Sequence, residues 1–175
     1  MGHPLEQLTV FDTAGRAVRL DTLWTHQPVV LLFVRHFGCL FCRQQIAEMQ
    51  PAVPRIRAAG AELYVIGNGS VEEARAFEEE LQPGVGLLTD PTRQTFCALQ
   101  MRSGLATVLR PSVLWRSLRA LRAGFTQTRV AGDPFQQGGV VVIGPGGLER
   151  YRYVSRTAGD HPDPGKVLAA VERAA

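Results

Sequence analysis

The sequence predicts an α/β domain in which a central mixed sheet is flanked by helices, and three observations support this class. Residues 29–34 form a continuous run of aliphatic and aromatic side chains, as in a strand buried on both faces. Strand-like and helix-like segments alternate over residues 61–101. A Gly-Pro-Gly-Gly turn at 144–147 joins two more strand-like segments and so adds antiparallel strands. With 175 residues, 45% of them hydrophobic, the chain fits a single domain, 1–175.

Two short strand patterns precede the buried run. Residues 8–11 and 17–20 are separated by a polar segment in which Gly15 can supply the turn. We therefore expect an N-terminal β-hairpin that lies at an edge of the domain or as a lid, outside its core.

A helix is expected directly after the central strand. From about Cys39, apolar residues recur three or four positions apart, at Ile46, Met49, Val53 and Ile56. Pro51 and Pro54 each remove a helical N–H donor. The helix should therefore kink or break near Gln50.

The next sixty residues continue the alternation. In chain order, we expect a strand at 61–66, a helix at 72–81 with Ser70 as its cap, a strand at 85–88, and a helix that begins at Asp90-Pro91 and runs through Met101. Near the carboxyl terminus, residues 140–143 and 148–154 read as a hairpin, and residues 167–171 lie in a last amphipathic helix.

Residues 103–137 interrupt the alternation, and we expect a loop-rich insertion that caps the domain. One helix within it is marked by Val113, Leu114, Leu118, Leu121 and Phe125. The six arginines between 102 and 129 are opposed only by Asp133, so the insertion is basic. We interpret this charge as a solvated helix face, since neither aromatic interleaving nor a nucleic-acid motif accompanies it. A surface for an acidic partner or nucleic acid is the alternative.

The composition also excludes several classes of protein. The longest apolar run has six residues, whereas a membrane-spanning helix needs about 20, so no membrane association is expected. The amino terminus lacks the pattern of a secretion signal, which favours a cytoplasmic location. Three cysteines do not make a disulfide framework. Redox chemistry, metal binding or packing remain as roles for them.

The residues Cys39-Leu40-Phe41-Cys42 stand where the central strand passes into the helix. In the first helical turn, unpaired N–H groups and the helix dipole favour a negative charge, so the Cys39 thiol should lose its proton readily. Residues three apart in a turn have Cβ atoms about 5–6 Å apart, which allows a disulfide to Cys42. We predict Cys39 as the attacking cysteine and Cys42 as the cysteine that resolves it.

Positively charged side chains surround this pair in the sequence. Arg35 and His36 precede it and Arg43 follows it, and each could stabilise the thiolate or contact a substrate. Such a thiolate can attack a disulfide, or a peroxide oxygen to give a sulfenic acid with which Cys42 then condenses.

Cysteine and histidine can also bind a metal or simply pack in the core. Zinc would need four ligands, and only Cys97 and scattered histidines could complete the set, so no metal is expected. Cys97 lies on an apolar helical stripe, where we expect a buried packing residue. His161, in Gly-Asp-His-Pro, reads first as a loop or helix-entry residue and second as a site residue.

Three segments, at 34–43, 136–147 and 159–162, resemble the peroxiredoxin-like branch of the AhpC/TSA superfamily. The resemblance spans nearly the whole chain. It implies a thioredoxin-like fold with an N-terminal hairpin, Cys39 as the peroxidatic or attacking cysteine, Cys42 as its partner, and antioxidant or peroxidase activity.

The sequence departs from the typical pattern of that superfamily at several positions. Leu32 and His36 replace the proline and the peroxide-binding threonine of the usual Pro-x-x-x-Thr-x-x-Cys motif. The arginine expected before the last hairpin is absent, so Arg129 or another arginine of the insertion would have to replace it. Gly138-Gly139 occupies the position where a thioredoxin has its proline. The cysteine pair therefore supports thiol redox chemistry more directly than it supports peroxide as the substrate.

The sequence thus predicts a cytoplasmic thiol oxidoreductase that reduces peroxides or disulfides through a Cys39/Cys42 cycle. We expect regeneration by a dithiol donor of the thioredoxin or glutathione type, with no metal or organic cofactor. A protein disulfide reductase without peroxidase activity and a non-catalytic redox sensor or binding module are the alternatives. Nucleic acid is not an expected partner, and a homodimer is left open.

Overall fold

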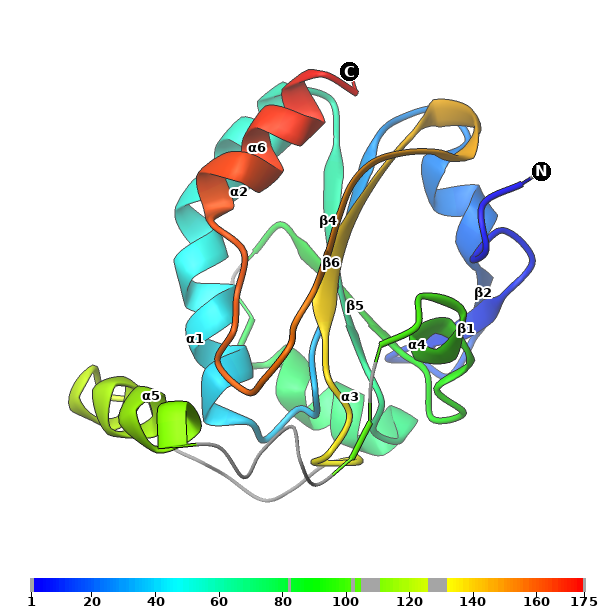
Figure 1. Cartoon of the computed structure of the whole chain (residues 1–175). Coiled ribbons are helices and arrows are strands. Elements are labelled where there is room, and N and C mark those ends of the chain that lie inside the picture. Colours follow the sequence, from blue (N-terminus) through cyan, green and yellow to red (C-terminus); the bar gives the residue numbers. More distant parts are fainter. Residues whose placement is uncertain (1, 82, 102, 105–110, 126–131, 175) are drawn as a thin grey trace.

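The computed structural model describes residues 2–81, 83–101, 103–104, 111–125 and 132–174. These residues form a seven-stranded mixed sheet in the order β2-β1-β5-β4-β3-β6-β7, with helices on both faces (Figure 1). The strands are β1 Thr9–Asp12, β2 Ala17–Arg19, β3 Val29–Phe33, β4 Glu62–Gly67, β5 Val85–Thr89, β6 Gly139–Gly144 and β7 Leu148–Val154. The helices are α1 Leu40–Met49, α2 Val53–Ala58, α3 Val71–Glu78, α4 Gln94–Ala98, α5 Pro111–Arg122 and α6 Pro164–Glu172.

Strand β3 is the centre of the sheet, as its uninterrupted apolar sequence predicts. It pairs in parallel with β4 and antiparallel with β6, so that Val30 lies opposite Leu63 on one side and Val142 on the other. All five of its residues are buried. The sheet is therefore mixed, and β3 delivers the chain that follows it to the middle of the domain.

The two faces of the sheet carry separate cores because side chains alternate along each strand. Val30 and Leu32 point to the core that α1, α2, α3, α5 and α6 cover. Leu31 and Phe33 point to the opposite core, which the N-terminal segment and the α4 region cover. Figure 1 shows α1, α2 and α6 on one side of the sheet and α4 with the N-terminal hairpin on the other.

Several local expectations are confirmed. The hairpin β1–β2 lies at one edge of the sheet, and β6–β7 lies at the other. Helix α1 ends at Met49, and a 3₁₀ turn at Gln50–Ala52 separates it from α2, as the two prolines require. Ser70 caps α3 in a reciprocal capping box with Glu73, a cap of the kind that contributes about 1 kcal/mol to stability.

The predicted helix from Asp90 through Met101 is wrong in its extent, because α4 covers only Gln94–Ala98. The Asp90 carboxylate accepts hydrogen bonds from the backbone N–H and the hydroxyl of Thr95, which closes a loop ahead of the helix. Arg93 adopts a left-handed conformation with φ 60°. The expectation of a buried Cys97 is also wrong, since its side chain on this short helix is exposed.

The insertion contains the expected helix, α5, which packs beside the first turns of α1. Val113 and Ala120 face the core, whereas Trp115, Leu118 and Leu121 are exposed. The apolar residues that marked the helix in the sequence therefore do not all lie on its buried face. Phe125 follows the end of α5 and is half-buried, and Arg129 lies outside the described residues.

Candidate active site

The loop between β3 and α1 places both cysteines at the carboxyl end of the central strand. Cys39 is the N-cap residue of α1, and its backbone N–H donates to His36 O over 3.1 Å. Phe37, buried within the same loop, packs its ring against Gly67 and Gly69; a Cβ atom at Gly67 would lie 2.3 Å from that ring. Because these two glycines have no side chain, the Phe37 ring can pack against them and hold the loop that carries the thiols.

The sulfurs of Cys39 and Cys42 are free thiols, and the residues are only 1% and 2% exposed. Arg35 contacts both of them. Its backbone N–H donates to Cys42 Sγ over 3.2 Å, and its guanidinium Nη1 lies 3.6 Å from Cys39 Sγ. One residue therefore supplies a neutral donor to one sulfur and a positive charge to the other.

The two thiols differ sharply in acidity. A hydrogen bond with Cys42, another with His36 and the positive charge of Arg35 together hold the pKa of Cys39 well below the ordinary thiol value, against the effect of burial. Burial raises the pKa of the Cys42 thiol well above the ordinary value, and its hydrogen bond to Cys39 adds to the rise. Cys39 is therefore the better nucleophile, and Cys42 keeps its proton.

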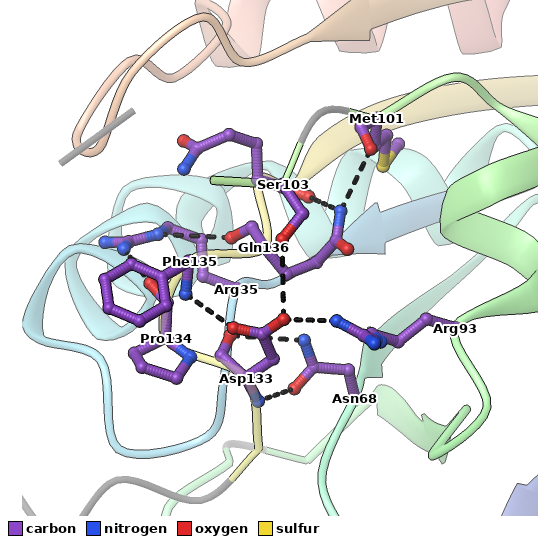
Figure 2. A network of polar contacts seen from close by, with 10 residues as sticks. Arg35, Asn68, Arg93, Met101, Ser103, Asp133, Pro134, Phe135 and Gln136 are labelled. Atoms are coloured by element: carbon purple, nitrogen blue, oxygen red, sulfur yellow. Dashed lines mark hydrogen bonds and ion pairs between the residues drawn. The ribbon is translucent and has the colours of Figure 1, made fainter. Parts of the chain in front are cut away.

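The Arg35 guanidinium is held in place by backbone carbonyls from a distant segment. Its Nε donates to Gln136 O over 3.3 Å, and its Nη2 donates to Pro134 O (Figure 2). These carbonyls precede β6, about 100 residues further along the chain. Because they fix two of the guanidinium nitrogens, the third is directed at Cys39.

Asp133 anchors the segment that supplies these carbonyls. Its backbone N–H donates to Asn68 Oδ1 over 2.9 Å, and its carboxylate pairs with Arg93 and accepts from the N–H of Phe135 over 2.8 Å (Figure 2). The ends of β4 and β5 thus hold residues 133–136 against the loop that contains Arg35.

The other two charged residues that the sequence singled out lie in different positions. His36 is buried, and its hydrogen bond to Cys39 stabilises the thiolate. Arg43 places Nη2 2.6 Å from Glu80 Oε1, beyond the end of α3. The structure therefore brings Arg35 and His36 to the attacking sulfur and directs the Arg43 guanidinium toward an acid on a neighbouring segment.

Comparison with known proteins gives the family. Residues 48–159, more than half of the chain, match the family described as AhpC/TSA antioxidant enzyme. The chain belongs to this family. The matched region begins after the cysteine pair, so membership rests on the rest of the domain.

Two curated relatives are similar to nearly the whole chain. The Arabidopsis thaliana thioredoxin-like protein AAED1, chloroplastic, is 30% identical over 95% of this chain and 71% of its own length. The mouse peroxiredoxin-like 2C is 30% identical over 97% of this chain and 81% of its own length. These relatives make the chain a peroxiredoxin-like thiol oxidoreductase, as the sequence predicted.

The fold is shared with solved peroxiredoxins. The peroxidoxin BcpB of Mycobacterium tuberculosis superposes with a TM-score of 0.69 over 95% of this chain and 92% of that chain, at 17% sequence identity. The predicted thioredoxin-like fold is thus confirmed for this AhpC/TSA protein.

Sequence reasoning missed two parts of the site. It named Arg35 as able to stabilise the thiolate, but it did not foresee that the segment before the last hairpin supplies the carbonyls that hold the Arg35 guanidinium. It also left Gln45 aside, although this buried residue lies one turn after Cys42 on α1. The three-residue spacing was the signal that could have found Gln45.

Within the part of the chain that the structure describes, no three His, Cys, Asp or Glu side chains are grouped as a metal site. No helix among the same residues is long and apolar enough to cross a membrane.

Proposed function

We propose that this AhpC/TSA protein reduces hydroperoxides through a Cys39/Cys42 thiol–disulfide cycle. The observation that carries this proposal is the double contact of Arg35, which directs a cation at Cys39 Sγ and a backbone donor at Cys42 Sγ. Arg35 and His36 hold Cys39 as a thiolate, while Cys42 stays protonated until it is needed.

In the first step, the Cys39 thiolate attacks the distal peroxide oxygen. The O–O bond breaks, Cys39 becomes a sulfenic acid, and the leaving alkoxide takes a proton to become an alcohol. In the second step, the Cys42 sulfur displaces hydroxide from the sulfenic acid, which gives the disulfide and water. A dithiol donor of the thioredoxin or glutathione type then reduces the disulfide and is itself oxidised. The cytoplasm, whose donors are of this kind, is the proposed location.

The burial of both sulfurs favours a small oxidant. A hydroperoxide can reach a thiol that is 1% exposed through a narrow opening, whereas a protein disulfide must bring its own backbone to the sulfur. The site lacks the usual threonine, and His36 stands in its place. His36 Nδ1 has no hydrogen-bond partner among the described residues, so it is free to contact a bound peroxide.

The test is to mix reduced protein with one equivalent of hydrogen peroxide or an organic hydroperoxide and to trap sulfenic acid for mass spectrometry. Cys39→Ser should abolish the adduct, and Cys42→Ser should make it accumulate. Cys97→Ser is the matched control, since this third cysteine is exposed on α4. An adduct that survives in Cys39→Ser would refute the assignment. Reduction of a model disulfide without peroxide turnover would instead identify a disulfide reductase.

A further inference from the structure

The second step of the proposed cycle needs a group that takes the proton from Cys42. A thiolate, and not a thiol, is the nucleophile in disulfide formation. Cys42 is buried, and its surroundings disfavour its charged form. Arg35, which donates to its sulfur, is a cation and cannot accept a proton. The inference below rests on the proposed function and concerns this second step alone.

A small cavity lies on the Cys42 side of the cysteine pair. Cys42, Gln45 and His161 line it, together with Ser155 and Thr157. Cys39 is not among the lining residues, so of the two cysteines only Cys42 borders the cavity. Polar side chains on this side of α1 therefore face the resolving thiol.

Gln45 gives this cavity an unused hydrogen-bond donor. The residue is 5% exposed, and its Nε2 has no hydrogen-bond partner among the described residues. A buried amide N–H without a partner is unfavourable unless a ligand or water satisfies it. Its place next to Cys42 is therefore suited to a thiolate, a water molecule or the hydroxide that leaves during disulfide formation.

His161 is oriented by a carboxylate on the same helix that carries Cys42. Its side chain is 11% exposed, and its Nδ1 lies 3.7 Å from Glu48 Oε2. The interaction with His161 lowers the pKa of Glu48, so the carboxylate is charged when it faces the imidazole. With Nδ1 directed at Glu48, Nε2 is the ring nitrogen left to accept a proton from the cavity.

We propose that His161 is the proton acceptor of the resolving step, oriented by Glu48 and assisted by the Gln45 amide. Cys42, Gln45 and Glu48 follow one another at intervals of three on α1, so each is the neighbour of the next on the helix surface, which leads from the buried Cys42 to the exposed Glu48. His161 comes from the loop between β7 and α6 and meets that side of the helix across the cavity.

The loop that carries His161 is fixed by its own hydrogen bonds. Asp160 accepts from Tyr153 Oη over 2.6 Å and from the N–H of Arg156 over 2.8 Å. Ser155 N–H donates to Gly138 O over 3.0 Å. Gly138 itself has no room for a Cβ atom, which would lie 2.0 Å from Phe33 O. The loop is thereby tied to the end of the central strand.

The proton balance of the step is complete. The imidazole removes the proton from the Cys42 thiol, and the thiolate attacks the Cys39 sulfenic sulfur. The S–S bond forms as the S–O bond breaks, and the leaving hydroxide takes the proton from the imidazolium to become water. The peroxide consumed in the first step is the oxidant, so no further electron acceptor is needed. When the Cys39 partner is a mixed disulfide, the leaving thiolate takes the proton instead.

Other charges around His161 bear on its pH dependence. Glu48 faces it from α1, Arg119 of α5 acts on Glu48, and Arg35 lies across the cavity. The carboxylate of Asp160, the residue before His161, accepts hydrogen bonds from the Tyr153 hydroxyl and the Arg156 N–H. Among the described residues, Glu48 is thus the carboxylate that pairs with the ring.

The decisive experiment measures the two steps separately in a single turnover with hydrogen peroxide. Acid quenching and mass spectrometry follow the sulfenic acid on Cys39 and then the Cys39–Cys42 disulfide. His161→Gln should leave sulfenic acid formation within about twofold of the parent and slow disulfide formation by about 100-fold or more, the range of a lost general base. His26→Gln, at an exposed position before β3, is the matched control and should close the disulfide at the parental rate.

Raising the pH should restore the rate in His161→Gln, because hydroxide then deprotonates Cys42. Disulfide formation at the parental rate in His161→Gln at pH 7 overturns the inference. If that variant does not fold, Glu48→Gln decides: a slowing of threefold or more supports the role, and an unchanged rate overturns it. A parent protein that forms sulfenic acid on neither cysteine refutes the proposed function itself, which is a distinguishable result.

Discussion

Cys39 and Cys42 lie three residues apart at the start of α1 and are almost equally buried, yet the pKa values of their thiols are shifted in opposite directions. Cys39 is the N-cap residue and receives the Arg35 guanidinium and a hydrogen bond from His36. Cys42 lies within the first turn, and its sulfur accepts from the backbone N–H of the same arginine. Burial alone would raise the pKa of both thiols. The difference shows that hydrogen bonds and nearby charges can shift the pKa values of two neighbouring buried thiols in opposite directions.

The largest expected effect is the contrast between the two thiols in their reaction with a small alkylating reagent. Because the pKa of Cys39 is depressed in the folded protein, its alkylation should remain fast as the pH falls from 8 to 6. Alkylation of Cys42 should rise only above the ordinary thiol pKa of about 8.5. We expect a difference of about 100-fold or more in the two alkylation rates at pH 7. Site-resolved mass spectrometry measures it, and equal rates for the two cysteines would contradict the contrast.

Arg35→Met should reduce the reactivity of Cys39 at low pH. The thiolate of Cys39 loses its nearest positive charge, so its pKa should rise and its reactivity at pH 6 should fall by about 10-fold or more. The pH profile of Cys39 alkylation checks this. The Cys42 profile should also move upward, because the Arg35 charge lowers the pKa of that thiol too, although the backbone N–H of residue 35 still donates to its sulfur. An unchanged Cys39 profile in a folded variant would contradict the role of the guanidinium.

Asp133→Asn should also raise the pKa of the Cys39 thiol, but by less than Arg35→Met does. The variant weakens the ion pair with Arg93 and loosens the segment whose carbonyls hold Arg35. We expect the Cys39 profile to move by a few tenths of a pH unit and its rate at pH 6 to fall about threefold. Stopped-flow measurement of peroxide consumption over the same pH range is the check. An unchanged profile in a correctly folded variant would show that Arg35 keeps its direction without Asp133.

Glu80→Gln should have the smallest effect on the pH profiles of the two thiols. It removes the charge of the Glu80 carboxylate that pairs with Arg43 Nη2. Since Glu80 is partly exposed, the ion pair is worth little, and we expect both thiol profiles to remain within about 0.2 pH units of the parent. A clear fall in the Cys39 pKa would mean that Arg43, once released, turns toward the thiolate.

The parts of the fold that were predictable from sequence are those that depend on neighbours along the chain. The apolar run of β3, the prolines after Gln50 and the Ser70 cap each act within a few residues, and the structure has them all. The position of Cys39 at the start of a helix is local in the same sense.

What the sequence did not reveal depends on distant contacts. The carbonyls that direct Arg35 come from residues 134 and 136, and the Asp133 segment is held by the ends of other strands. The late start of α4 follows from the side chain of Asp90, which bonds Thr95 and competes with the helix. Exposure of Cys97 follows in turn, because a five-residue helix buries only one side.

The two edges of the sheet have a consequence for how copies of this protein behave at high concentration. A free strand edge can pair with another copy and start aggregation. Here one outer strand, β2, has only three residues. The other, β7, presents the exposed arginines 150 and 152 and is irregularly paired with β6 near Val142. Both edges therefore resist strand addition, so a concentrated solution should stay free of sheet-extended polymers.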